Sequence, residues 1–245
     1  MLPSAIDRTR AGWLRGVTYA HRGWHGNGRL ENSPSAFRAA IDAGYGIECD
    51  VQLTADDQAA VIHDFVLDRL TGKTGAVRGR TTPMLAEIPL NGGEPIWLLP
   101  NLLAAIAGRV PLLIEIKSGH GIPVDRLCRA VARALEGYGG KAAVMSFDPQ
   151  AVRWFARNDR RIIRGLVVTE DGNPGAFAVS RGILARQFAR AEFIAHDVRD
   201  LPSRFAAAMR DRGMPLLTWT VNSPELRARA AQFADAPIAE GAGLA

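Results

Sequence analysis

The sequence has few cysteines and no long apolar run, and each lack excludes some classes of protein. Cys49 and Cys128 are the only cysteines, and they form no CxxC pattern, which argues against a thiolate zinc site and a disulfide framework. No window reaches transmembrane length, and Met1–Arg15 lacks the continuous apolar stretch of a signal peptide. We therefore expect two reduced core cysteines in a cytoplasmic protein without stable membrane insertion.

Concentrated positive charge is also absent, although the formal net charge is +5. The excess comes from scattered arginines, which are densest at Arg8, Arg10 and Arg15 and at Arg157, Arg160, Arg161 and Arg164. Nucleic-acid binders usually gather positive charge into a stripe with motif support, and neither an RNA-binding signature nor a zinc-finger spacing occurs. We expect solvated helix faces and no nucleic-acid partner. A mild positive balance would still attract a phosphate-bearing substrate.

What the chain does contain is an alternation of short apolar runs with longer amphipathic stretches. The short runs predict strands at Val17–Ala20, Gly46–Leu53, Pro111–Ile116, Ala142–Phe147, Ile162–Val168, Phe193–Ala195, Leu216–Val221 and Pro237–Ala239. The amphipathic stretches predict helices at Pro34–Ala43, Leu98–Ala107, Val124–Leu135, Pro149–Asn158, Gly182–Arg190, Arg204–Asp211 and Pro224–Phe233. Ser33, Asp148 and Ser223 each precede a proline and are the predicted N-caps.

The alternating order predicts parallel strands covered by helices. Eight strands in this order suit a closed TIM-type (β/α)8 barrel better than an open doubly wound sheet, and such barrels typically have about 250 residues. The chain has 245 residues, 47% of them hydrophobic, which suits one large globular domain. We expect a single domain over residues 1–245, with the barrel core at about 17–241.

Two segments interrupt the alternation after the second strand. Gly46–Leu53 and Ala59–His63 are joined by only five residues, too few for a parallel crossover, so a β-hairpin is expected. With the turn centred on Asp56, the register pairs Asp50 with Val61 and Glu48 with His63. The segment Leu67–Pro95 is rich in Gly, Thr and Pro, and it predicts an inserted loop region beside the barrel mouth.

Three carboxylates lie on predicted strands in positions that suit a metal site. Residues two apart on a strand share a face, so Glu48 and Asp50 point to the same side, and Glu115 and Lys117 do so on a later strand. Buried carboxylates need a partner, and an all-oxygen set suits Mg²⁺ or Ca²⁺ better than zinc. We expect one divalent cation at Glu48, Asp50 and Glu115. The alternative is that each acidic residue is half of a structural ion pair.

Two histidines close predicted strands in the way expected of catalytic residues. His21 follows the run Val17–Ala20, and His63 follows Ala59–Ile62, so both lie where TIM barrels place their active sites. Imidazoles can accept or donate a proton near neutral pH, which predicts an acid–base pair. The remaining histidines, His25, His120 and His196, are expected to be ordinary polar residues.

The motifs together resemble the glycerophosphodiester phosphodiesterase family. In order, they are His21-Arg22-Gly23, Glu31-Asn32-Ser33 with Ala36-Phe37, Ile47-Glu48-Cys49-Asp50-Val51 with Thr54, His63-Asp64 with Leu67-Asp68-Arg69, Leu113-Ile114-Glu115-Ile116-Lys117, Ser146-Phe147 and Trp219-Thr220-Val221-Asn222. The matching elements extend from about residue 17 to about residue 222. The segment Ala234–Gly241 departs from the family pattern, which usually has Asp-Gly, apolar residues and an Asp before Pro.

The resemblance implies a barrel like that of phosphatidylinositol-specific phospholipases C and assigns roles to further residues. Metal ligands match Glu48, Asp50 and Glu115, and the acid–base pair matches His21 and His63. Arg22 and Lys117 would contact the phosphodiester. Trp219 and Asn222 would line the substrate pocket, although Trp219 also suits a plain core position, and Glu31 is a secondary candidate for substrate binding.

The expected reaction is hydrolysis of a small-molecule glycerophosphodiester to sn-glycerol 3-phosphate and an alcohol. A phospholipase D-type hydrolase of lysophospholipids is one alternative, and it would require an apolar groove or a membrane-facing helix near the barrel mouth. A non-catalytic barrel that binds phosphate or metal is another. Binding alone needs no pair of titrating imidazoles, which favours the enzyme.

Overall fold

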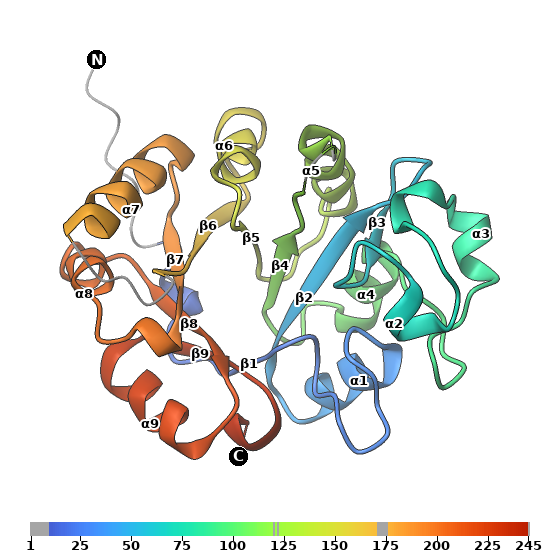
Figure 1. The fold of residues 1–245 in the computed structure, drawn as a ribbon, viewed down its shortest axis with the longest axis horizontal. Helices are drawn as coiled ribbons and strands as arrows, with labels where there is room; N and C mark the ends of the chain where they lie inside the picture. The colour runs from blue at the N-terminus through green and yellow to red at the C-terminus, as the bar shows by residue number, and fades with distance from the viewer. Residues whose placement is uncertain (1–9, 120, 122, 171–175, 245) are drawn as a thin grey trace.

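The computed structural model describes residues 10–119, 121, 123–170 and 176–244, so His120 and the N-terminal residues 1–9 lie outside the described part. Its parallel strands are β1 (Tyr19–Ala20), β2 (Gly46–Leu53), β4 (Leu112–Ile116), β5 (Ala142–Ser146), β6 (Ile163–Val168), β7 (Phe193–Asp197), β8 (Leu216–Val221) and β9 (Ala236–Ala239). Each pairs with the next around the ring, and β1 pairs with both β9 and β2 (Figure 1). The eight-stranded ring is therefore closed, and the predicted TIM-type barrel is confirmed.

Helices connect successive strands and cover the outside of the barrel (Figure 1). They are α1 (Pro34–Asp42), α4 (Leu99–Ile106), α5 (Val124–Ala134), α6 (Pro149–Asn158), α7 (Ala176–Ala189), α8 (Arg204–Asp211) and α9 (Pro224–Phe233). The three predicted caps are confirmed, because the side chains of Ser33, Asp148 and Ser223 accept hydrogen bonds from backbone N–H groups in the first turn. Helix α7 begins six residues earlier than the sequence predicts.

Alternate residues of the strands face two separate apolar layers. Leu113, Met145 and Phe193 belong to the cluster inside the barrel, whereas Ile47 and Cys49 pack with the surrounding helices. The short helix η1 (Gly12–Leu14) places Leu14 in the inner cluster and leads to Gly16, whose N–H donates to the carbonyl of Asp235 just before β9. The amino ends of the strands are therefore filled with side chains. Both cysteines are buried and unpaired, as expected.

The hairpin after β2 exists, but its predicted register is wrong by one residue. Strand β3 (Ala59–Val61) runs antiparallel to β2 with Val51 opposite Val61, and the Ile62 N–H donates to the carbonyl of Asp50. The turn is centred on Asp56, as predicted, and this centre pairs residues equally distant from it. Asp50 is consequently opposite Ile62, and His63 lies beyond the end of the ladder.

The inserted region contains more structure than the loop that the sequence predicts. It forms α2 (Asp68–Thr71), the short helix η2 (Val77–Gly79) and α3 (Thr82–Ala86), beside α1 and β3 (Figure 1). Leu67, Leu70, Val77 and Leu85 form a small core with the hydrophobic residues Ile88, Leu90 and Ile96. Two further short helices, η3 (Val198–Asp200) and η4 (Gly241–Gly243), follow β7 and β9. Among the described helices, none is both long enough and apolar enough to cross a bilayer.

Candidate active site

Three buried carboxylates converge at the carboxyl ends of β2 and β4. Glu48 and Asp50 lie on the inner face of β2, and the parallel register places Asp50 beside Glu115 of β4. One oxygen from each carboxylate can be chosen so that all three lie within 4.8 Å of one another. Burial, followed by the charges of Asp50 and Glu115, raises the pKa of Glu48 well above its usual value. The three acids therefore repel one another inside the barrel.

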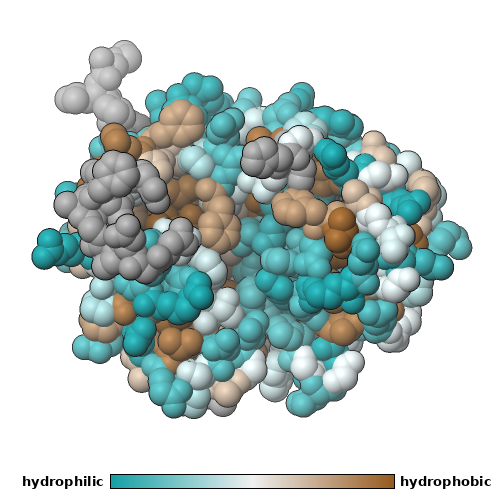
Figure 2. All heavy atoms as spheres, viewed as in Figure 1, coloured by the Kyte–Doolittle hydropathy of each residue, from teal (hydrophilic) through white to brown (hydrophobic). Residues whose placement is uncertain are grey.

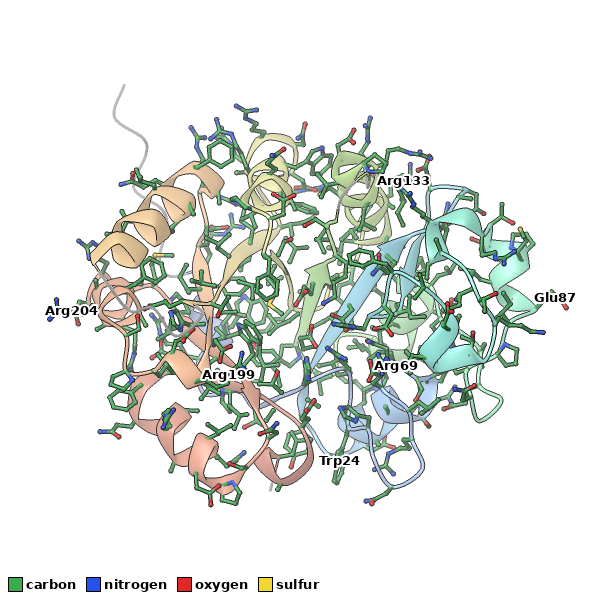
Figure 3. All side chains as sticks on the ribbon, in the orientation of Figure 1. Trp24, Arg69, Glu87, Arg133, Arg199 and Arg204 are labelled. Atoms are coloured by element: carbon green, nitrogen blue, oxygen red, sulfur yellow. The ribbon has the colours of Figure 1, made fainter. Side chains whose placement is uncertain are left out.

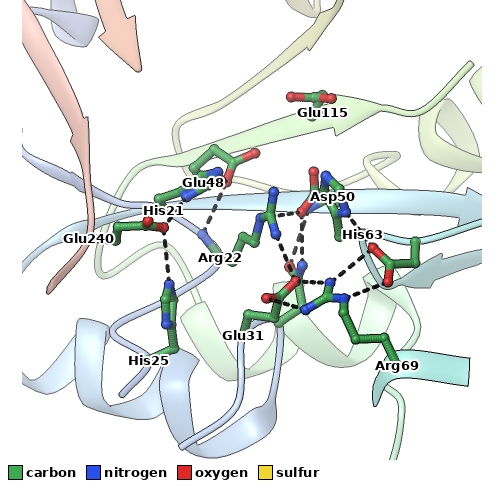
Figure 4. Close-up of polar contacts among 12 residues, drawn as sticks. His21, Arg22, His25, Glu31, Glu48, Asp50, His63, Arg69, Glu115 and Glu240 are labelled. Carbon is green, nitrogen blue, oxygen red and sulfur yellow. Dashed lines mark hydrogen bonds and ion pairs between the residues drawn. The ribbon is translucent and has the colours of Figure 1, made fainter. Parts of the chain in front are cut away.

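Two cations partly offset this negative charge. The Nζ of Lys117 lies 2.8 Å from Asp50 Oδ1 and 2.5 Å from Glu115 Oε1. Arg22 approaches from the loop after β1, with its Nε 3.3 Å from Asp50 Oδ2 (Figure 4). Burial would raise the pKa of Asp50, but Lys117 and then Arg22 outweigh it and lower the pKa to about 2. Asp50 is thus held ionised at neutral pH.

The three carboxylates of Glu48, Asp50 and Glu115 suit a hard divalent cation. Glu48 Oε2 accepts from the Arg22 backbone N–H at 3.1 Å, whereas Glu48 Oε1 is buried and has no hydrogen-bond partner among the described residues. An orphaned buried carboxylate oxygen is costly unless a ligand satisfies it. Three oxygen donors from three acids also match the preference of Mg²⁺ and Ca²⁺. Glu48, Asp50 and Glu115 could therefore hold such an ion, as the sequence predicts.

The loop after β1 is bent, and the bend brings its residues into contact with Glu48 and Asp50. Arg22 and Asn32 both have positive φ, at 55° and 54°. Asn32 donates from Nδ2 to Asp50 Oδ2 at 2.9 Å and accepts from the Asp50 backbone N–H at 3.3 Å. Gly23 also has positive φ, and a Cβ there would lie 2.9 Å from the Ala36 carbonyl carbon, so the turn has no room for a side chain. Asn32 is a site residue that was predicted only as part of the Glu31-Asn32-Ser33 motif.

His21 is held by a carboxylate that the sequence analysis did not single out. Its Nδ1 lies 2.6 Å from Glu240 Oε2, and its Nε2 lies 3.9 Å from Glu48 Oε2 (Figure 4). Glu240 directly follows β9, next to β1 in the barrel, and His25 Nε2 lies 3.4 Å from the same Oε2. The hydrogen bond with His21, and then the contact with His25, hold the pKa of Glu240 far below its usual value. His25, expected to be an ordinary polar residue, therefore lies beside the site.

His63 is held in a comparable way on the other side of the carboxylates. Its Nδ1 lies 2.7 Å from Asp64 Oδ1, and Arg69 binds Asp64 through Nε at 2.7 Å and Nη2 at 2.9 Å. Arg69 also binds Glu31, which in turn accepts from Arg22 at 2.8 Å. Figure 3 shows Arg69 near the centre of this face, whereas Glu87 and Arg133 lie toward the edge. Glu31 thus bridges Arg22, which contacts Asp50, and Arg69, which contacts Asp64 beside His63.

An apolar cavity of about 460 Å³ opens beside Lys117 and His63. Phe65, Val66 and Phe147 line it, and each is more than 40% exposed. In Figure 2 the centre of this face is hydrophilic, and hydrophobic residues lie next to it. A groove lined by both charged and apolar side chains suits an amphiphilic ligand.

The two remaining predicted pocket residues differ in their placement. Trp219 packs edge-to-face on Phe147 with ring centroids 5.2 Å apart, and its Nε1 donates to the carbonyl of Ala195. Trp219 therefore supports the wall of the groove. Asn222 lies just beyond β8 and is exposed, and none of the site contacts between described residues involves it.

Comparison with known proteins agrees with this geometry. Residues 21–239 match the Glycerophosphoryl diester phosphodiesterase family. The chain belongs to this family. YhdW of Bacillus subtilis is 31% identical over 220 residues, which cover 86% of this chain and 88% of that protein. The protein is accordingly an enzyme, a phosphoric diester hydrolase.

Solved structures support the fold assignment. An Oleispira antarctica phosphodiesterase, solved in complex with its product sn-glycerol-3-phosphate, superposes with a TM-score of 0.81 at 20% identity and 94% coverage of both chains. The glycerophosphodiester phosphodiesterase of Thermotoga maritima gives a TM-score of 0.74 at 25% identity, with 91% of this chain and 94% of that chain covered. The family barrel is thus shared over nearly the whole chain.

Proposed function

We propose that this family member, acting as one domain, hydrolyses glycerophosphodiesters to sn-glycerol 3-phosphate and an alcohol, with His21 and His63 as the acid–base pair. The observation that carries the proposal is the placement of two carboxylate-held imidazoles on either side of a buried acidic group that could hold Mg²⁺ or Ca²⁺. The product bound to the Oleispira antarctica phosphodiesterase is consistent with this substrate class.

The phosphodiester would bind with its charged oxygens toward Lys117 and Arg22. Lys117 has its Nζ between Asp50 and Glu115 but also lines the cavity, so one face of the ammonium group is accessible. When bound at Glu48, Asp50 and Glu115, a divalent cation would supply further positive charge to offset that of the phosphoryl group. These fixed charges stabilise the transition state because they need no rearrangement when charge develops.

Proton transfer would be divided between the two histidines. One imidazole accepts a proton from the attacking oxygen as that oxygen bonds to phosphorus, and the other gives a proton to the alcohol oxygen as its bond to phosphorus breaks. The attacking oxygen belongs either to water, which gives sn-glycerol 3-phosphate directly, or to a neighbouring glycerol hydroxyl, which gives a cyclic phosphate that water then opens. Glu240 and Asp64 would be positioning residues, since each fixes the Nδ1 side of one imidazole and leaves Nε2 for the substrate. Such acid–base roles are worth roughly 10² to 10⁴ in rate each.

The proposal is tested by assaying purified protein against soluble glycerophosphodiesters with Mg²⁺ or Ca²⁺. His21→Ala and Glu115→Ala should abolish release of sn-glycerol 3-phosphate, while circular dichroism shows that both variants are folded. EDTA should stop the wild-type reaction, and added Mg²⁺ or Ca²⁺ should restore it. Near-wild-type turnover by either folded variant would refute the assignment of the site.

The apolar cavity favours lysophospholipids as a second candidate substrate class. Ile88 and Leu90 of the inserted region, and Ile96 just after it, are buried in its small core and therefore line no groove. Phe65, Val66 and Phe147 provide one instead, directly beside Lys117. A lysophospholipid could place its phosphate at Lys117 and apolar atoms along this wall. Faster turnover of lysophospholipid micelles than of soluble diesters would make this the main activity.

A further inference from the structure

A second group of metal-binding side chains lies beside the buried acids. His21, His25 and Glu240 each offer a ligand atom, and within the described residues these atoms lie within 4.8 Å of one another. His21 directly follows β1, His25 is on the same loop, and Glu240 directly follows β9, so the group forms where the barrel closes. In Figure 4 the carboxylate of Glu240 lies between the two imidazoles.

The spacing of these atoms is close to that of a tetrahedral site. Zinc–nitrogen and zinc–oxygen bonds of about 2.0–2.2 Å place neighbouring ligand atoms about 3.3–3.5 Å apart. His25 Nε2 and Glu240 Oε2 are 3.4 Å apart already. His21 Nδ1 and Glu240 Oε2 are 2.6 Å apart, so they would have to separate by less than about 1 Å, which a rotation of either side chain provides.

The buried Nε2 of His25 also indicates a ligand. Its Nε2 is buried, and its contact with Glu240 is not aligned as a hydrogen bond, so among the described atoms this nitrogen has no hydrogen-bond partner. A buried ring nitrogen in that state is costly, and a bound cation would satisfy it. The three side chains as a whole are 14–27% exposed, which allows an ion to enter and leaves a fourth position for water.

We propose that His21, His25 and Glu240 form a second cation site, selective for a borderline divalent ion such as Zn²⁺ or Co²⁺. Two nitrogens and one oxygen suit such ions, whereas the three oxygens of Glu48, Asp50 and Glu115 suit Mg²⁺ or Ca²⁺. Occupancy ties up the Nδ1 of His21 and displaces Glu240 from it. Under the proposed function, which this consequence rests on, Zn²⁺ is therefore an inhibitor even when Mg²⁺ is saturating.

The site itself is tested by titrating the full-length protein with Co²⁺ in excess Mg²⁺, because tetrahedral Co²⁺ has strong visible absorption. Wild type should bind one tetrahedral Co²⁺. His25→Gln and Glu240→Gln should weaken this binding by about tenfold or more, a loss typical of damaged metal sites. Glu115→Gln, the matched control in the other acidic group, should retain it. Thermal unfolding checks that each variant is folded.

Equal Co²⁺ affinity in wild type and His25→Gln, or loss of the Co²⁺ spectrum in Glu115→Gln, would overturn the proposal. A parallel assay compares the Zn²⁺ concentration for half-inhibition, with each protein referred to its own rate without Zn²⁺. That concentration should rise about tenfold or more in His25→Gln. If wild type shows no turnover at all, the proposed function fails, and the Co²⁺ titration still decides the metal site.

Discussion

Two buried polar clusters lie at the carboxyl ends of the barrel strands, and only one of them has the features of an active site. The acidic cluster on β2 and β4 has three carboxylates, Glu48, Asp50 and Glu115, against two cations. The second cluster contains Glu170, His196 of β7 and Ser203, in which the imidazole Nε2 lies 3.1 Å from the Glu170 carboxylate and the hydroxyl donates to it. It contains one carboxylate, one imidazole and one hydroxyl.

The difference lies in charge balance and access. The acidic cluster adjoins a cavity through Glu115, Lys117 and His63, and burial and its neighbouring carboxylates raise the pKa of Glu48, so a bound cation would stabilise the ionised carboxylates. In the other cluster His196 is 0% exposed, and its Nδ1 also contacts the backbone carbonyl of Asp197. A buried polar group at a strand end thus indicates function only where its charges are unbalanced and open to a ligand.

The strongest test of this contrast is Glu48→Gln. The change removes a cation ligand but also removes a carboxylate whose ionised form is disfavoured by burial and by Asp50 and Glu115. We expect kcat/KM to fall by roughly 10³, with a cation-free melting temperature equal to or above that of wild type. Steady-state kinetics and thermal unfolding in EDTA measure both. An activity within tenfold of wild type would show that the acidic cluster is not the reaction centre.

His196→Ala should have the opposite effect. It removes a buried hydrogen-bond partner of Glu170 and leaves a cavity, so the free energy of unfolding should fall by about 2–4 kcal/mol. Activity per folded molecule should stay within about threefold of wild type, because no described contact joins His196 to the acidic cluster. Urea denaturation and active-protein kinetics report the two values. A large loss of turnover in folded protein would show that the cluster of Glu170, His196 and Ser203 also contributes to activity.

The apolar wall beside the acidic cluster is tested by Phe65→Ser. If lysophospholipids bind along this wall, their KM should rise about tenfold, as expected for losing part of the apolar contact area of one side chain. The KM of a small soluble diester should change by less than about twofold. Met84→Ser is the matched control, because Met84 on α3 is equally exposed but does not line the cavity. Equal effects of both substitutions would discount the groove.

The smallest expected effect concerns the ion pairs around His63. Hydrogen bonds from Arg69 hold the pKa of Asp64 far below its usual value. This stabilisation is therefore complete above the pKa of about 3.9 in the unfolded chain and is lost as the pH falls further toward the folded value. Because Arg69 is half-exposed, Asp64→Asn should cost less than about 1 kcal/mol.

The pH dependence of that cost is measurable by calorimetry. The difference in melting temperature between wild type and Asp64→Asn should be largest near pH 6–7 and shrink toward pH 3. Asp211→Asn on α8 is a matched surface control. A difference that grows on acidification would contradict the sign of the Asp64 pKa shift.

Much of the barrel could be predicted because its signals are local. The bounds of β2, β8, α6, α8 and α9 match the prediction residue for residue. Apolar runs mark the strands in the sequence, and Asp-Pro and Ser-Pro caps mark the starts of α6 and α9. The shared orientation of Glu48 and Asp50, and the inward position of Glu115, were predictable because side chains alternate between the two faces of a strand. The turn of the hairpin was placed correctly, but the residue pairs on either side of it were counted one position out, so the predicted register was wrong.

The other parts of the site depend on contacts that no local pattern encodes. Glu240 meets His21 across 219 positions of sequence, and it lies in the segment that departs from the family pattern. His25 reaches Glu240 only through the shape of the loop after β1. The apolar wall arises because Phe65 and Phe147, from different loops, both remain exposed after folding. These residues become neighbours only when the strands have closed into the barrel.

The position of β1 links the orientation of His21 to closure of the barrel. This strand of two residues lies between β2 and β9, and the His21 backbone N–H donates to the carbonyl of Ala239, one residue before Glu240. A chain that stops short of residue 236 would contain Glu48, Asp50 and Glu115 but would lack Ala239 and Glu240, the two residues after β8 that bind His21. The orientation of His21 therefore depends on β9 joining the sheet and closing the ring.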